Sequence, residues 1–185
     1  MSFTNPAGSA TEAAARYVGA LLELLGDRDP LEVLGRTQAA LAEAVDGIDP
    51  EDLYRPEVPG KWSIVQVAQH LADSELVNGY RIRAVLTEVE PAIPGYDQDA
   101  WAQELDYAHG RFEDAFEQLV ALRGANLKLV RSLTDEQLDR WGVHAERGRE
   151  SVRQLIRLLA AHDLVHLRQI ERIRRSLDDA PGRPS

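Results

Sequence analysis

Proline and glycine divide this chain into long segments of helix-forming residues. The two residue types cluster at 26–30, 47–60, 91–95, 142–148 and 180–185. The segments between these clusters are rich in Ala, Leu, Glu, Arg and Gln, which favour helix. No segment alternates β-branched and polar residues over the length of a strand, so we expect no strands. The chain is therefore predicted to be all-α.

Local start signals set the expected helix boundaries. Asp29-Pro30 offers a cap followed by proline at the first helical position. In three capping boxes a Ser or Thr precedes a Gln by three residues: Ser63–Gln66, Thr134–Gln137 and Ser151–Gln154. The expected helices cover 10–25, 30–45, 63–90, 97–132 and 151–175, with a short turn at Thr134. Apolar stripes on such helices must be buried, which predicts one domain, residues 1–185, built as a four-helix bundle with an extra N-terminal helix.

The composition excludes several functions. The formal net charge of −10 makes the chain a poor partner for nucleic acid or an anionic membrane. It has no cysteine, which excludes disulfides, cysteine zinc sites and cysteine nucleophiles. No uncharged apolar run approaches the ~18 residues of a membrane span, and residues 1–5 lack the basic and apolar parts of a signal peptide. We expect a cytoplasmic protein.

Two histidines interrupt the apolar stripe of the last expected helix. His162 and His166 are four residues apart and so share one helix face, which also carries Leu159 and Ile170. Buried imidazoles need partners for their ring nitrogens. A metal ion would take one lone pair from each ring, whereas the alternative is a pair of half-buried, hydrogen-bonded histidines.

His70 lies on the inward face of the second bundle helix, seven residues after the cap at Ser63. If the helices that carry His70 and the His162–His166 pair are antiparallel or offset, the three rings can meet at one level. Three histidines with a fourth position open would form a catalytic rather than a structural metal site.

The chain resembles the DinB-like superfamily, and within it the YfiT-type members. The first signature is Gly60-Lys61-Trp62-Ser63 followed by His70-Leu71-Ala72-Asp73, and the second is His162-x-x-x-His166-x-x-Gln169. The loops 93–101 and 135–151 are also similar to the family's connections, so the resemblance covers roughly residues 31–175. YfiT-type members often have further histidines where this chain has Val165 and Gln169.

The resemblance implies an up-down four-helix bundle, commonly a homodimer, with loose termini at 1–9 and 178–185. It implies one divalent ion, nickel or zinc first and iron or manganese next, held by His70, His162 and His166. Characterised relatives include S-transferases that use low-molecular-weight thiols such as bacillithiol, whereas many others are known only provisionally as metal-dependent hydrolases.

Several further residues are candidates for the site. Gln169 is expected to orient a ligand or substrate, or to be a surface glutamine. His144 is a site-lining acid or base, or a structural residue. Arg147 and Arg149, with Arg153, cluster at a helix start. We expect them either to bind the carboxylate of a thiol cofactor or to remain solvated. Asp73 accepts the His70 ring N–H or faces solvent, and Trp62 packs as a hydrophobic staple. His109 is expected on the surface.

Three functions remain open at this point. The first is a metal-dependent S-transferase that activates a small thiol. The second is a hydrolase that uses metal-bound hydroxide. The third is a stress-associated bundle that binds metal without catalysis. The first two act on a small-molecule substrate.

Overall fold

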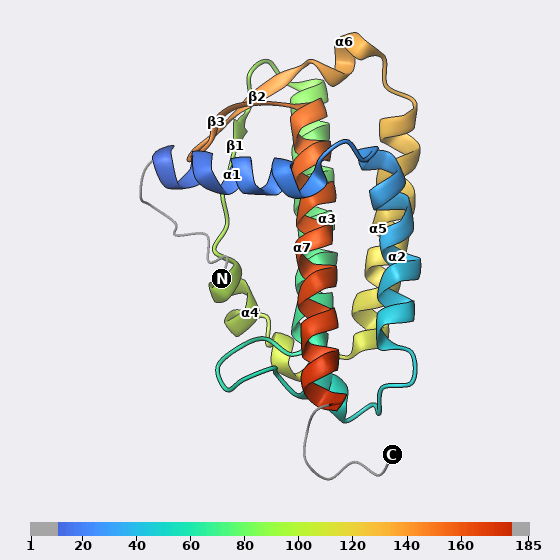
Figure 1. Ribbon diagram of the computed structural model, residues 1–185. Coiled ribbons are helices and arrows are strands. Elements are labelled where there is room, and N and C mark those ends of the chain that lie inside the picture. The colour runs from blue at the N-terminus through green and yellow to red at the C-terminus, as the bar shows by residue number, and fades with distance from the viewer. Residues whose placement is uncertain (1–10, 179–185) are drawn as a thin grey trace.

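The computed structural model describes residues 11–178, and most of them are helical (Figure 1). The helices are α1 (Thr11–Leu25), α2 (Pro30–Val45), α3 (Ile64–Thr87), α4 (Gln98–Glu104), α5 (Phe112–Arg131), α6 (Asp135–Leu138) and α7 (Val152–Asp178). Two short 3-10 turns, η1 (Asp52–Tyr54) and η2 (Tyr107–His109), lie between them. The all-α class and the N-terminal helix are confirmed. Of the termini expected to be loose, 1–9 and 178–185, all residues lie outside the described part of the chain except Asp178, which is the last residue of α7.

The helices begin where the caps were predicted. The Asp29 side chain accepts a hydrogen bond from the Leu31 N–H at 2.8 Å. Both bonds of the capping boxes at Ser63 and Thr134 are formed, and the Ser151 hydroxyl accepts from the Gln154 N–H at 3.1 Å. These caps satisfy backbone N–H groups that have no partner within the helix. They also fix where α3 and α7 start, and hence the height of their histidines.

Helices α3 and α5 run in the same direction, although they follow each other in the chain. Gly110, just before α5, lies against Gln69 in the first half of α3, whereas Gly79 lies against Asn126 near the ends of both helices. The chain between α3 and α5 must therefore return along the bundle, and β1, α4 and η2 lie on this return (Figure 1).

Helices α2 and α7 likewise run in the same direction. Thr37 contacts Asp163, and one turn or more farther along each helix Ala44 contacts Arg174. The pair α2 and α7 is antiparallel to the pair α3 and α5 (Figure 1). The four-helix bundle is confirmed, and α3 and α7 have the opposed directions that a meeting of their histidines requires.

A small sheet contradicts the expectation of no strands. Strands β1 (Ala92–Ile93), β2 (Trp141–His144) and β3 (Gly148–Ser151) pair in the order β1-β2-β3, parallel and then antiparallel. Strands of two and four residues are too short to show an alternating pattern. Their pairing depends on segments distant in the sequence, which local propensity does not report.

The helix expected over 97–132 is broken into α4, η2 and α5. Asp106 has a left-handed backbone with φ of 52° and precedes η2. A Cβ at Gly110 would lie 2.0 Å from the Gln69 side-chain nitrogen, so a larger residue here would require the Gln69 side chain to move. Gly124 lies within α5, which runs on through it.

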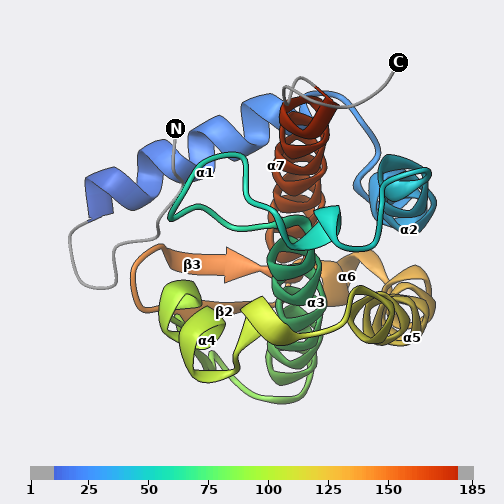
Figure 2. The same cartoon turned by 90° about the horizontal axis from the view of Figure 1, so that it is seen from below.

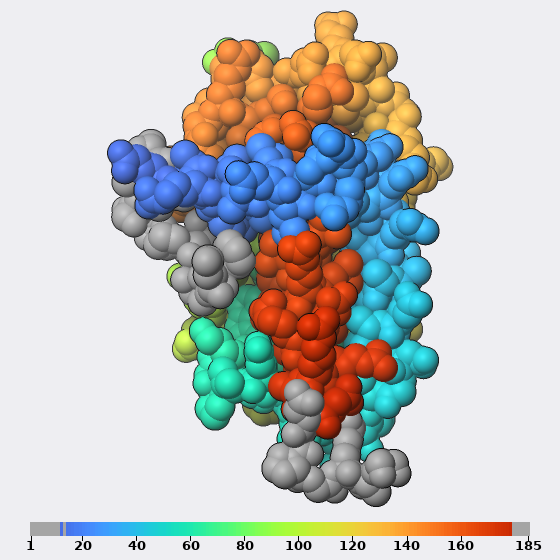
Figure 3. Space-filling view, viewed as in Figure 1, coloured from blue at the N-terminus to red at the C-terminus, as the bar shows by residue number. Residues whose placement is uncertain are grey.

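Helices α3 and α7 form the centre of the molecule. Figure 2 shows α2 and α5 on one side of this pair, and α1, α4 and the sheet on the other. Helix α1 crosses α7 on the surface (Figure 3) and buries Leu21 and Leu25 in the core. None of the helices in the described part of the chain is long and apolar enough to cross a membrane.

Candidate metal centre

Three histidines meet between the two central helices. His70 comes from α3, and His162 and His166 come from adjacent turns of α7. The Nε2 atom of His162 lies 2.9 Å from that of His70 and 3.2 Å from that of His166. One nitrogen from each ring lies within 4.8 Å of the other two. The structure therefore brings together the three residues that the sequence selected.

The surroundings keep these imidazoles neutral. Burial lowers the pKa of His162 to about 4, with a further contribution from the Arg123 cation. Burial, and then His162, lowers the pKa of His166 to about 3. The pKa of His70 is well below its ordinary value, because of burial first and the other two rings second. At neutral pH each ring can offer a lone pair to a cation.

The hydrogen bond that His166 makes fits a bound divalent ion. The Nδ1–H of His166 donates to the Gln169 side-chain oxygen at 2.9 Å, which leaves Nε2 as a lone pair facing the cluster. Gln169 therefore touches the nitrogen remote from the cluster, as groups that orient metal-binding histidines do. Close lone pairs repel, and a cation between them removes that repulsion. Three imidazoles form a donor set that suits a divalent transition-metal ion.

A pocket of about 90 Å³ opens beside the histidines. His162 and Ser74 line the pocket and join it to the cluster, because the Ser74 hydroxyl lies 3.5 Å from His70 Nε2. The same hydroxyl lies 2.9 Å from the Tyr96 hydroxyl. The Tyr96 ring packs on Trp101 with 4.7 Å between centroids. A small molecule in this pocket would contact His162 directly and reach the cluster through His162 and Ser74.

His144, at the end of β2, lines the same pocket and is buried. Its Nδ1 accepts hydrogen bonds from the backbone N–H groups of Glu146 and Arg147 at 3.1 and 3.3 Å. The proton of the neutral ring is therefore on Nε2, which is buried without a partner among the described residues. Burial, and then the Arg147 cation, lowers the pKa of His144 to about 4.

The predicted arginine cluster is spread over three environments. Arg147 lines the pocket and donates two hydrogen bonds to Glu150, at 2.6 and 2.9 Å. The Arg149 guanidinium lies 3.7 Å from the centre of the Trp141 ring and is not among the residues that line the pocket with the histidines. Arg153 pairs with acidic residues around α6.

Other residues of the motifs have packing roles. Asp73 accepts hydrogen bonds from Tyr107 and Gln118, rather than from His70. The Trp62 ring packs against His70, with 5.0 Å between centroids. His109 is exposed, as expected, and pairs with Asp106 on the surface.

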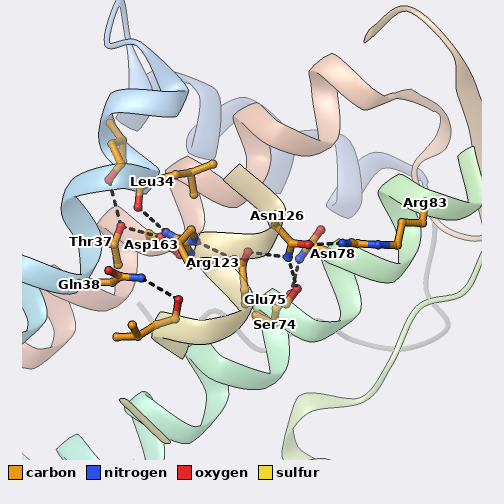
Figure 4. A network of polar contacts seen from close by, with 12 residues as sticks. Leu34, Thr37, Gln38, Ser74, Glu75, Asn78, Arg83, Arg123, Asn126 and Asp163 are labelled. Atoms are coloured by element: carbon orange, nitrogen blue, oxygen red, sulfur yellow. Dashed lines mark hydrogen bonds and ion pairs between the residues drawn. The ribbon is translucent and has the colours of Figure 1, made fainter. Parts of the chain in front are cut away.

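A buried charge network behind the histidines was not predicted (Figure 4). Arg123 of α5 bonds Glu75 and forms an ion pair with Asp163, each at 2.8 Å, and all three side chains are buried. Glu75 follows Ser74 of the pocket, and Asp163 follows His162 of the cluster. The sequence feature that could have predicted this network is the presence of charged residues on helix faces that point into the bundle. The network ties the helices that carry the histidines to α5.

The buried histidines predict acid sensitivity of the metal-free protein. A histidine whose pKa is lower in the folded than in the unfolded chain adds stability that is full above about pH 6.5 and is lost toward its folded pKa. For His144 that window is about pH 6.5 to 4. We expect the free energy of unfolding, measured with urea and chelator, to fall across it less steeply in His144→Asn than in the parent. The exposed-site variant His109→Gln should keep the parent slope, and equal slopes in all three proteins would contradict a neutral His144.

Known proteins are similar to this chain in sequence and in fold. The model of the DinB superfamily matches residues 34–170. A protein of Oceanobacillus iheyensis is 34% identical over 131 residues, covering 71% of this chain and 75% of its own. YfiT of Bacillus subtilis is 34% identical over 116 residues, covering 63% and 65%. Both relatives are named, provisionally, as metal-dependent hydrolases.

The solved structure of Bacillus subtilis YfiT matches this fold with a TM-score of 0.74 and 27% identity, covering 95% of this chain and 94% of YfiT. It is described as "a probable metal-dependent hydrolase with an unusual four-helix bundle topology". The parallel pairs α3–α5 and α2–α7 are a departure from a simple up-down order. Sequence and fold together show that this chain is a YfiT-like member of the DinB superfamily.

Proposed function

We propose that this protein is a metal-dependent S-transferase, which activates a small thiol at the three histidines and joins it to an electrophile held in the adjacent pocket. The observation that carries the proposal is the meeting of three neutral imidazole nitrogens, one of them from His162, which lines that pocket. A divalent ion on such a site lowers the pKa of a bound thiol or water and so supplies a nucleophile at neutral pH. The chain needs no cysteine of its own for this chemistry.

The residues have distinct roles in this proposal. His70, His162 and His166 hold the ion, with nickel or zinc as first candidates and iron or manganese next. Gln169 is a positioning residue, since it accepts the Nδ1–H of His166 and keeps that ring turned inward. His144 offers its Nε2–H to a group in the pocket. We further propose that the protein acts as a homodimer, as family members commonly do.

Hydrolysis is the second candidate, and the names of the relatives support it. The same histidines and the same pocket would serve water as the nucleophile and an ester or amide as the substrate. The two reactions differ in one requirement, because transfer needs a thiol and hydrolysis does not.

An assay with two substrates separates the candidates. With 1-chloro-2,4-dinitrobenzene, sulfur forms a bond to the ring carbon, chloride leaves with its electron pair, and the thiol proton passes to solvent. We expect thiol-dependent turnover by the metal-loaded protein and a loss of about a hundredfold or more in His166→Ala. His109→Ala is the matched control and should retain full activity, because His109 is exposed and outside the site.

Each outcome of this assay selects one function. Turnover of 4-nitrophenyl acetate without thiol would select the hydrolase. Turnover of neither substrate by a metal-loaded protein would favour the non-catalytic bundle. Full activity in His166→Ala would contradict a metal-based mechanism of either kind.

A further inference from the structure

We infer that Arg81 forms a second binding position in the pocket, which takes a carboxylate of the substrate or co-substrate. The inference rests on the proposed function in one respect, namely that this pocket holds the reacting molecule. Nothing in the motifs pointed to Arg81, which lies on α3 beyond both signatures.

Arg81 is a buried cation without an acidic partner. Its side chain lines the pocket, and only 6% of the residue is exposed. Among the described residues no carboxylate lies within ion-pair distance of it. The Nη2 group donates to the Pro94 carbonyl at 2.5 Å, and the buried Nε–H has no hydrogen-bond partner in the described part of the chain. A guanidinium stays charged at neutral pH, so the missing partner is an anion.

The other buried arginine of the described residues differs from Arg81 in having acidic partners. Arg123 is 1% exposed and is bound by two carboxylates, Glu75 and Asp163, and by the Leu34 carbonyl. The fold thus supplies acids to a buried arginine whose role is structural. Arg81 lines the pocket and has no acid within ion-pair distance among the described residues.

The remaining groups of the pocket agree with an anionic ligand. His144 presents a buried Nε2–H without a partner, and Arg147 contributes a second positive charge. Two acids are near: Glu150 is bound to Arg147, and Glu146 lies beside Gly95. The open donors are all N–H groups, and an ionised carboxylate only accepts hydrogen bonds. A carboxylate of a small molecule therefore matches them.

The spacing along α3 sets the length of the ligand. Arg81 is seven residues after Ser74, which is two helical turns or roughly 10 Å. Ser74 contacts His70 of the metal cluster. A ligand with its reactive group at the histidines would place its carboxylate at Arg81 across a chain of about four to eight atoms.

The test compares each carboxylate with its neutral amide. The probes are 6-mercaptohexanoate and 6-mercaptohexanamide for the zinc-loaded protein, and hexanoate and hexanamide for the metal-free protein, with affinities measured by calorimetry. The proteins are the parent, Arg81→Gln and the control Arg83→Gln. Arg83 is on the same helix but bonds Asn126 outside the pocket. The parent and Arg83→Gln should bind the carboxylate about tenfold or more tightly than the amide, and Arg81→Gln should bind both equally.

Thermal unfolding of the probe-free proteins gives an independent readout. Arg81→Gln should unfold at the same temperature as the parent or higher, because it removes a buried charge that the fold leaves unpaired. A marked drop in that temperature would make Arg81 a structural residue bound to Pro94 and would overturn the inference. Equal affinity of the parent for carboxylate and amide would also overturn it. The metal-free protein could prefer the carboxylate while the metal-loaded protein shows no turnover. That result would support the Arg81 site and contradict the proposed function.

Discussion

The double variant His162→Ala/His166→Ala is expected to lose the single equivalent of divalent metal that the parent chain binds. Both rings come from α7, and the Nε2 atom of His162 lies 2.9 Å from that of His70 and 3.2 Å from that of His166. Their removal leaves one imidazole, and a single neutral ligand holds a divalent ion too weakly to survive purification. Elemental analysis of tag-free protein, loaded with zinc or nickel and then dialysed, measures the change directly.

Metal binding should also stabilise the parent protein against unfolding, and should not stabilise the double variant. Metal that binds only the folded chain stabilises it by RT ln(1 + [L]/Kd), about 4 kcal/mol when free metal is a thousandfold above Kd. Zinc should therefore raise the unfolding temperature of the parent and leave that of the double variant unchanged. His109→Ala should behave as the parent does. Absence of metal from the parent even after loading would mean that the three rings are polar groups of the core.

The candidate site could be predicted because local rules placed each part of it. The box at Ser63 fixes the start of α3 and so the position of His70. The four-residue spacing of His162 and His166 puts both rings on one face of α7. For the three rings to meet, α3 and α7 must also run in opposite directions. The order of helices along the chain does not decide this, because the bundle contains parallel pairs.

Apart from the candidates His144 and Arg147, the rest of the pocket could not be predicted, because it depends on contacts between distant segments. His144 faces the pocket only because β2 pairs with β1 and β3. Tyr96 reaches Ser74 only because the expected long helix breaks and the return segment packs along α3. The segment after the break passes close to α3, where Gly110 lies against Gln69, a contact between residues that no local propensity connects.

Arg123→Met is expected to cause the largest loss of stability of any substitution considered for this chain, about 3–5 kcal/mol in the free energy of unfolding. Arg123 is the cation that Glu75 and Asp163 share, and no side chain of the three is more than 1% exposed. Methionine has a similar volume, so packing changes little, but two carboxylates remain buried without their partner. Urea unfolding of metal-free protein at neutral pH measures the loss.

A matched surface substitution separates burial from ion pairing as such. Arg153 also pairs with two acids, Asp135 and Asp139, at 3.0 Å each, but these pairs are exposed. Water and salt screen exposed pairs, so Arg153→Ala should leave the unfolding midpoint close to that of the parent. Similar losses in both variants would mean that the number of ion pairs, rather than their burial, decides the stability of this bundle.

A triple variant identifies the cause of the loss at Arg123. In Glu75→Gln/Arg123→Met/Asp163→Asn the two acids become neutral amides of nearly the same shape, so no unpaired charge is buried. If orphaned carboxylates are the cause, this protein should regain most of the stability that Arg123→Met loses. If the triple variant is as unstable as the single one, the bond from Arg123 to the Leu34 carbonyl and the packing around it are the cause instead. Because Asp163 follows His162 on α7, the same comparison, repeated with zinc, shows whether a neutral network still holds that helix in the register that the metal centre needs.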